Sequence, residues 1–401
     1  MTGNVHRLRQ SLYFSAPVMG GGVTVLVVLL TAWYKSETAA GDLAVVLAVG
    51  NVGKGALALG LHGPLLQMVG QAVANRRRVL QWAIVLASAF AVVPIGLFFF
   101  VTPNSYVAGF VVGCCGAAAL AIQVDARLGD HLPSFVMATV LQGLTLAAAF
   151  VAALLEFNQI RAVLLFTVLA TVGLSLWHMR LLIDSSQSTV AFGPTSKVGL
   201  QTASHSTMAA FIAYGDRFFV DYFLDRKATG IYNTVYLLSL LGVPIVSAFS
   251  NVWVRDLLSA SLDALSGQIR KIRSQTLWLS GGVGAIGLIA ALVAIHFRGY
   301  GSSASVVAFV LVTGTLPYGM YVLSSTACVR QSDGLKRLAQ SSVVVGIASL
   351  LSSTFLIGVF GMIGAAVNTV LLNIAWWLTA ARANRELEVR RILLPFWRSV
   401  E

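Results

Sequence analysis

Apolar runs of about 20 residues recur along the whole chain and constrain its fold more than any other feature. A run of this length crosses the hydrocarbon core of a bilayer as an α-helix, because a helix satisfies every backbone polar group inside the segment. Hydrophobic residues make up 57% of the chain and charged residues only 10%, whereas soluble domains carry about 25% charged residues. The sequence therefore predicts an all-α integral membrane protein.

The predicted spans form two sets of six, separated by a polar segment. This count divides the chain into an N-terminal six-helix lobe (1–182), a cytoplasmic linker (183–197), a C-terminal six-helix lobe (198–381) and a basic amphipathic cytoplasmic tail (382–401). The spans of the first lobe are 11–33, 43–69, 80–101, 106–122, 133–155 and 162–182. Those of the second lobe are 198–220, 230–252, 277–297, 305–329, 338–360 and 362–381.

The distribution of Lys and Arg predicts the orientation. With the N-terminus in the cytoplasm, 20 of the 27 Lys and Arg residues fall on the cytoplasmic side and 5 on the opposite side. Because cytoplasmic loops are enriched in these residues, both termini are predicted to be cytoplasmic. The net charge of +12 is spread over short loops, which argues against nucleic-acid binding.

Two basic segments have an apolar stripe. In residues 255–273, Leu and Ile recur at steps of three and four residues, and the tail from residue 381 onward has a similar composition. Such helices lie in the plane of a membrane interface. We therefore expect both segments to lie along the inner leaflet, next to membrane lipids.

The sequence has few signs of enzymatic chemistry. It has no GxxxxGK[ST] phosphate-binding loop, no metal-ligand spacing and no Ser/His/Asp arrangement, and its six His residues are scattered. We therefore expect a protein that is not an enzyme and holds no cofactor or metal. A polymerase or ligase acting on lipid-linked sugars would need a long outer loop, whereas the predicted outer loops are short.

Lys54 is the principal candidate site residue, because it lies near the middle of the second span. It shares one helix face with Asn51 and His62. A lysine at that depth faces a wet cavity, binds an anion or pairs with a partner inside the bundle. The first six spans place no acidic residue at mid-depth to serve as that partner.

The seventh span provides a second polar face. Gln201, His205 and Asp216 lie within about 60° of one another on a helical wheel, and Arg217 follows Asp216. The Asp216–Arg217 pair faces a cavity or anchors a helix end at the membrane interface. Asp216 and His205 are candidates for coupling to a proton or sodium gradient, since imidazole titrates near neutral pH.

Other polar residues have weaker claims. Gln142, Asn233 and Asn368 line a polar path or tie helices together by hydrogen bonds. The loop of Arg76, Arg77 and Arg78 either captures a diphosphate on the cytoplasmic side or serves only to orient the protein.

The region from residue 198 to 252 also carries a family resemblance. A long apolar helix is followed by the residues Asp216-Arg217, Phe218-Phe219, Tyr222 and Gly230-Ile231-Tyr232. This order resembles the middle of the Wzx-type flippases, the O-antigen and repeat-unit transporters of the MATE-like multidrug/oligosaccharidyl-lipid/polysaccharide exporter superfamily. The resemblance implies a MATE-like fold in the bacterial inner membrane and a role in lipopolysaccharide or exopolysaccharide biosynthesis. It also implies an oligosaccharide on undecaprenyl diphosphate as substrate and a polysaccharide polymerase as a possible partner.

The charges inside the spans agree with that implication. Lys54 and Arg217 outnumber the single interior carboxylate, Asp216, and both cations are good phosphate ligands. We therefore predict a flippase that moves the lipid-linked oligosaccharide to the outer leaflet by alternating access. The alternative is a cation-coupled multidrug or small-molecule antiporter of the same fold.

Overall fold

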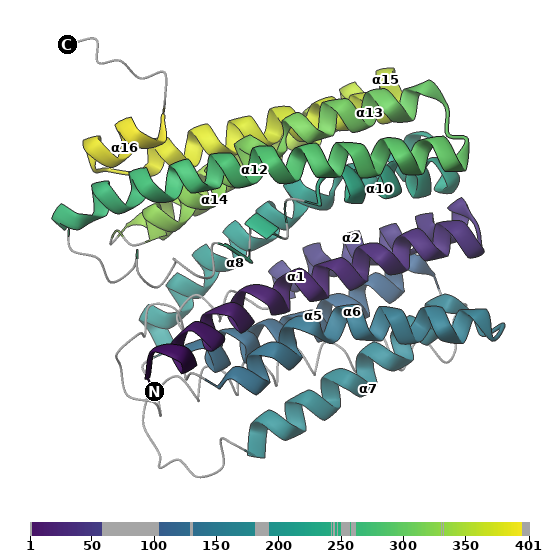
Figure 1. Ribbon diagram of the computed structural model, residues 1–401, viewed down its shortest axis with the longest axis horizontal. Coiled ribbons are helices and arrows are strands. Elements are labelled where there is room, and N and C mark those ends of the chain that lie inside the picture. Colours follow the sequence, from purple (N-terminus) through teal and green to yellow (C-terminus); the bar gives the residue numbers. More distant parts are fainter. Residues whose placement is uncertain are drawn as a thin grey trace. The chain divides into compact units, whose positions relative to one another are not determined.

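The computed structural model describes residues 2–57, 104–128, 131–180, 192–241, 262–329, 331 and 333–394, with isolated positions between 243 and 257. The chain divides into two compact units, Met1–Phe218 (unit 1) and Phe219–Glu401 (unit 2). Eight helical segments in the described ranges are long and apolar enough to cross a membrane. The protein is therefore an all-α, multi-pass membrane protein (Figure 1).

Parts of the predicted organisation cannot be compared with the structure. The predicted third span, residues 183–191 of the predicted linker and the last seven residues of the tail lie outside the described residues. Residues 192–197 of the linker form the first turns of a helix. The linker boundary stays a prediction.

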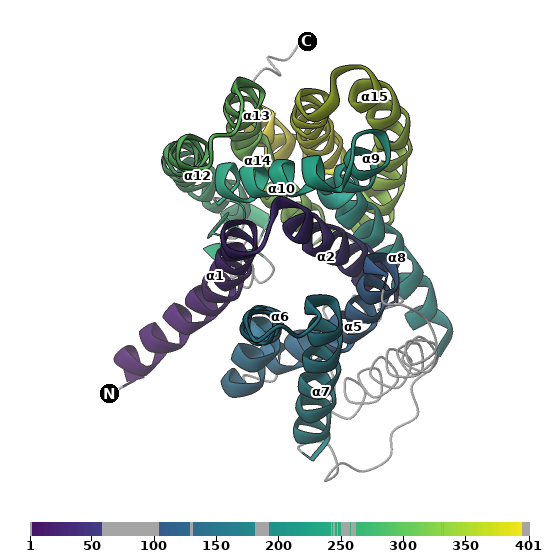
Figure 2. The same cartoon turned by 90° about the vertical axis from the view of Figure 1, so that its right-hand side faces the viewer.

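The described part of unit 1 contains six helices that pack on one another. They are α1 (Thr2–Tyr34), α2 (Glu37–Leu57), α5 (Ser105–Leu128), α6 (Leu132–Leu154), α7 (Gln159–Arg180) and α8 (Phe192–Tyr214). Helix α2 packs on α1, α5 and α8, while α6 packs on α1, α5 and α7 (Figure 2). Helix α2 thus lies at the centre of the contacts that position Lys54.

Glycines let the backbones of α2 and α5 approach closely. A Cβ added at Gly109 would lie 2.5 Å from Cβ of Val49, and one at Gly113 would lie 3.1 Å from the carbonyl oxygen of Gly50. Their spacing of four residues is the small-xxx-small pattern of helix pairs in membranes. Any larger residue at these positions would push the two helices apart.

The predicted seventh span is two helices instead of one. Helix α8 ends before Gly215, and α9 (Asp216–Phe223) begins after it. The amide of Phe218 donates to the carbonyl oxygen of Gly215 at 3.0 Å, a tighter turn than that of an α-helix. The angles of a single helical wheel therefore do not apply on both sides of the break. His205 and Asp216 do not lie on one face of one helix.

The described part of unit 2 contains the other helices. They are α10 (Arg226–Ser239), α12 (Leu262–Arg298), α13 (Ser302–Thr313), α14 (Thr315–Val329), α15 (Gly334–Ala383) and α16 (Leu387–Leu393). Helix α12 packs on α10, α13, α14 and α16, and α15 packs on α13 and α14. Figure 2 shows α12, α13, α14 and α15 of this unit nearly end-on.

Helix α15 makes two passes rather than one. It has 50 residues and departs from helical geometry only at Gly361, where φ is 57°. The side-chain Nδ2 of Asn368 donates to the hydroxyl of Ser353 at 2.8 Å, although 15 residues of straight helix would separate them by about 22 Å. The chain therefore reverses at Gly361, between the predicted spans 338–360 and 362–381.

The two amphipathic segments are placed differently from the prediction. Residues from Leu262 onward continue directly into α12, and the stripe of Leu265, Ile269 and Ile272 is buried. The tail helix α16 packs on α12 and buries Ile392 and Leu393. The expectation that these apolar stripes face the inner leaflet is wrong, because unit 2 covers them itself.

Candidate functional site

The position of Lys54 on α2 is set by glycines on two sides. The stem of Lys54 crosses Gly116 of α5, where an added Cβ would lie 3.3 Å from Cδ and 3.5 Å from Cβ of the lysine. The next residue, Gly55, faces α8, and a Cβ there would lie 2.8 Å from the carbonyl oxygen of Ser206. Close backbone packing thus holds the lysine at a defined place in unit 1.

The charge of Lys54 has no counter-charge in the described part of the chain. The side chain is half-buried, and no carboxylate of the described residues forms an ion pair with it. Asp42 of the same helix instead accepts a hydrogen bond from Ser105 Oγ at 2.7 Å. Because an uncompensated charge among packed apolar helices is costly, an anion at this position would be stabilised.

Two predicted site residues, Asn51 and His205, lie near Lys54. Asn51 precedes it by one turn, is half-buried and donates from Nδ2 to the carbonyl oxygen of Leu47 at 2.9 Å. His205 is also half-buried and precedes Ser206, the residue whose backbone meets α2. Lys54 and His205 therefore flank the same crossing of α2 and α8.

The remaining predicted site residues of unit 1 are more scattered. Gln201 lies one turn before His205 on α8, and Gln142 lies on α6; both are half-buried. His62 and the capture loop of Arg76, Arg77 and Arg78 lie outside the described residues.

Asp216 and Arg217 pair with each other inside unit 1. Nη1 of Arg217 lies 2.7 Å from Oδ1 of Asp216, and the two side chains are 1% and 3% exposed. The same Nη1 donates to the carbonyl oxygen of Ala213 at 2.9 Å, and the guanidinium lies over the ring of Tyr214, 5.1 Å from its centroid. These local contacts close the junction of α8 and α9, and they cancel the charge of Arg217 within the protein.

A buried hydrogen-bond network in unit 1 was not predicted from the sequence. Nδ1 of His178 lies 3.3 Å from Oγ of Ser134, and its Nε2 lies 3.3 Å from Oδ2 of Asp125. The conclusion that no Ser/His/Asp arrangement exists is thus wrong. The three side chains are buried, so the network ties α5, α6 and α7 together and leaves Ser134 without access to a substrate.

No short sequence motif predicts that network, because Ser134 and Asp125 lie 44 and 53 residues before His178 in the chain. It also does not form a metal centre: no group of three His, Cys, Asp or Glu side chains that could hold a metal occurs in the described ranges.

The amide side chains of Asn233, Asn368 and Asn373 in unit 2 are buried, and those of Asn368 and Asn373 form hydrogen bonds within that unit. Asn368 binds Ser353 across the turn of α15, and Asn233 on α10 is 2% exposed. Asn373 donates from Nδ2 to the carbonyl oxygen of Gly314 at 3.3 Å, at the break between α13 and α14. These amides were predicted either to line a polar path or to join helices by hydrogen bonds. The contacts of Asn368 fit the second alternative.

Comparison with known proteins identifies the fold. No family model and no curated protein matches the sequence. Among solved structures, the MATE multidrug transporter DinF-BH superimposes with a TM-score of 0.66 at 13% identity, over 96% of each chain.

Two further solved structures agree. An outward-facing multidrug resistance MATE family transporter of the MOP superfamily gives a TM-score of 0.62 at 12% identity, over 93% of this chain and 94% of that one. A MOP superfamily transporter from Pyrococcus furiosus, whose binding pocket of reverse polarity suggests a different function, gives 0.62 at 11% identity over 93% of each chain. This chain therefore has the fold of the MATE transporters.

Proposed function

We propose that the protein is a transporter that flips an undecaprenyl-diphosphate-linked oligosaccharide from the cytoplasmic to the outer leaflet. The observation that carries this proposal is the half-buried Lys54, which has no carboxylate partner in the described part of the chain. An ammonium group in such a place favours an anionic passenger, and a diphosphate supplies the charge. The step is binding and alternating access, with no covalent bond made or broken.

Two further considerations support an anionic passenger. The order of residues from Asp216 to Tyr232 resembles that of Wzx-type flippases. The MOP transporter from Pyrococcus furiosus, with its pocket of reverse polarity, is a precedent for this fold departing from a single pocket chemistry.

The remaining roles are assigned as part of the same proposal. Asn51 and His62 line the anion-binding site around the ammonium of Lys54. Arg217 becomes available to the same anion if its ion pair with Asp216 opens. Asp216 and His205 are the candidates for coupling to a proton or sodium gradient. The capture loop of Arg76, Arg77 and Arg78, and the polar residues Gln201, Gln142, Asn233 and Asn368, would contact the head group along its path. The protein would lie in the bacterial inner membrane with both termini cytoplasmic, serving O-antigen or exopolysaccharide assembly beside a polymerase.

The proposal is tested by replacing Lys54 in a cell that depends on this protein for its surface glycan. Lys54→Gln removes a charge-assisted contact to phosphate, so glycan display should fall by about ten-fold or more. Lys54→Arg keeps the charge and should retain most of the display. The matched control is Lys35→Gln, since Lys35 is exposed at the end of α1. Display that is unchanged in Lys54→Gln at equal protein level would remove the lysine from the mechanism.

The second candidate is a cation-coupled multidrug antiporter, which the similarity in fold to multidrug MATE transporters favours. Cationic drugs need an available carboxylate, whereas the buried Asp125 and Asp216 are engaged by His178 and Arg217. A deletion strain with increased drug sensitivity and normal surface glycan would select this candidate over the flippase.

A further inference from the structure

The outward face of α12 in unit 2 is unlike the rest of that helix. Its opposite face, with Ile269, Thr276 and Ser280, is buried against neighbouring helices. The outward face carries Lys271 and Trp278, both exposed, with Trp278 82% exposed. One long helix thus presents a continuous surface that no described part of unit 2 covers.

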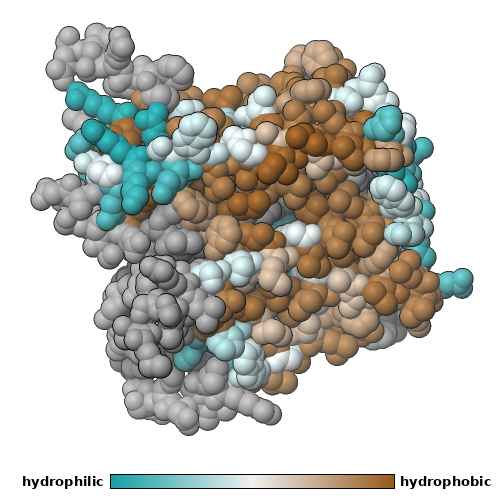
Figure 3. Space-filling model, in the orientation of Figure 1, coloured by the Kyte–Doolittle hydropathy of each residue, from teal (hydrophilic) through white to brown (hydrophobic). Residues whose placement is uncertain are grey.

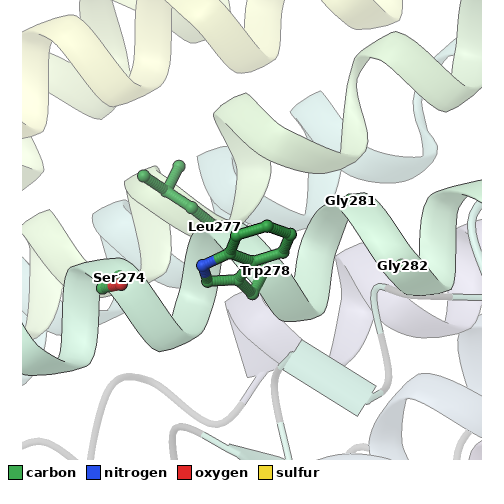
Figure 4. A pocket seen from close by; sticks show the side chains of 5 residues that line it. All are labelled: Ser274, Leu277, Trp278, Gly281 and Gly282. Carbon is green, nitrogen blue, oxygen red and sulfur yellow. The ribbon is translucent and has the colours of Figure 1, made fainter.

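A hollow lies in the middle of this face. It has a volume of about 490 Å³ and is lined by Ser274, Leu277, Trp278, Gly281 and Gly282. Figure 4 shows the indole of Trp278 and the side chain of Leu277 between Ser274 and the two glycines. A Cβ added at either glycine would meet nothing within 4 Å, so the hollow exists because both side chains are absent.

Along this face a charged side chain is followed by polar and then by apolar ones, the order found in a phospholipid from head group to acyl chain. Lys271, Ser274 and Trp278 follow one another at steps of three and four residues, so they lie within about 60° on the helix surface. No described carboxylate forms an ion pair with Lys271. Beyond the glycines the same side of α12 carries Ile286 and Ile289, which are 63% and 64% exposed. In Figure 3, hydrophilic side chains gather at the α16 end of unit 2 and apolar ones cover its middle.

We propose that this face of α12 is a binding site for an anionic phospholipid. The phosphate binds the ammonium of Lys271 and the hydroxyl of Ser274, and Trp278 lies at the level between head group and chain, where indoles concentrate in membrane proteins. One acyl chain occupies the hollow at Gly281 and Gly282. The residues of this site all lie on α12, and its ligand is not the proposed transport substrate. The site can therefore be tested independently of the flippase function.

The test uses the full-length protein in phosphatidylcholine nanodiscs that contain phosphatidylglycerol with brominated acyl chains. Bromine quenches nearby indoles, and the emission of Trp278 is isolated by subtracting that of the Trp278→Phe variant. Brominated phosphatidylglycerol should reach half-quenching at about a five-fold lower mole fraction than brominated phosphatidylcholine. This ratio is the preference for an anionic lipid that one lysine near a membrane surface is expected to give.

Variants separate the head-group and chain contacts. Lys271→Gln should abolish the preference for phosphatidylglycerol, whereas the control Lys336→Gln, at an exposed lysine of α15, should leave it unchanged. A Cβ at either glycine meets nothing within 4 Å, so Gly281→Leu and Gly282→Leu place side chains in the hollow and should lower quenching by both lipids. The proposal is overturned by equal quenching by the two lipids in the native protein, by equal effects of the two lysine variants, or by a dimer that covers Trp278.

Discussion

The two units bury different kinds of polar groups. In the described part of unit 1, Asp125, His178, Asp216 and Arg217 are buried and Lys54 is half-buried. In the described part of unit 2, the buried polar residues are Ser, Thr and Asn. A buried charge depends strongly on its partner, whereas a neutral hydrogen bond contributes only about 1 kcal/mol. Among the described residues, the fully buried charges therefore lie in unit 1.

The units also differ in how their helices meet. In unit 1, α2 and α5 touch through the backbones of Gly50 and Gly113. In unit 2, α14 and α15 meet through the stacked rings of Tyr321 and Trp376, whose centroids are 3.6 Å apart. Glycine contacts tolerate no added atoms, while aromatic contacts fill space. Four substitutions test this contrast, from the largest expected effect to the smallest.

Replacing Asp216 with Asn should have the largest effect, because it leaves the guanidinium of Arg217 buried without its carboxylate. We expect the free energy of unfolding to fall by about 3–5 kcal/mol, measured by thermal unfolding in detergent. Asp333→Asn in unit 2 is the control, since the side chains of Asp333 and its partner Arg385 are 52% and 66% exposed and the expected loss is below about 1 kcal/mol. Equal losses in the two variants would break the contrast between the units.

Removing the imidazole of His178 comes next. His178→Leu leaves the carboxylate of Asp125 and the hydroxyl of Ser134 buried without their partner, so we expect a loss of about 2–3 kcal/mol. His296→Leu, at an exposed histidine near the end of α12, should change the unfolding temperature little. A silent His178→Leu variant would mean that the network does not tie α5, α6 and α7 together.

The glycine packing of unit 1 is tested at Gly109. Gly109→Leu forces a side chain against Val49, and overpacking of this kind costs about 1–3 kcal/mol. Gly173→Leu on α7 is the control, because nothing lies within 4 Å of a Cβ at that position. Similar unfolding temperatures for both variants would contradict the close contact of α2 and α5.

The smallest effect is expected in unit 2. Asn368→Leu removes the neutral hydrogen bond to Ser353 across the turn of α15, and we expect a loss of about 1 kcal/mol. Gln340→Leu, at an exposed position of the same helix, provides the baseline. If Asn368→Leu destabilises as much as Asp216→Asn, neutral polar groups matter as much as charges and the contrast between the units is lost.

The class of fold and much of its segmentation follow from the sequence alone. The cost of an unsatisfied backbone group in lipid acts on each segment of about 20 residues separately, so the apolar runs predict most of the described spans. The reversal at Gly361 was also predictable, since two full-length apolar runs adjoin there. The same local reasoning singled out Lys54 as a charge at mid-depth.

Tertiary structure alone decided what each polar group contacts. Asp125, Ser134 and His178 meet only because α5, α6 and α7 pack together. The break at Gly215 removed the shared face predicted for α8 and α9. Likewise, whether the stripe on α12 faces lipid or protein depended on how α12 packs against the other helices of unit 2. Periodicity along one helix reveals which face is apolar, but the partner of that face is set by packing between segments distant in the chain.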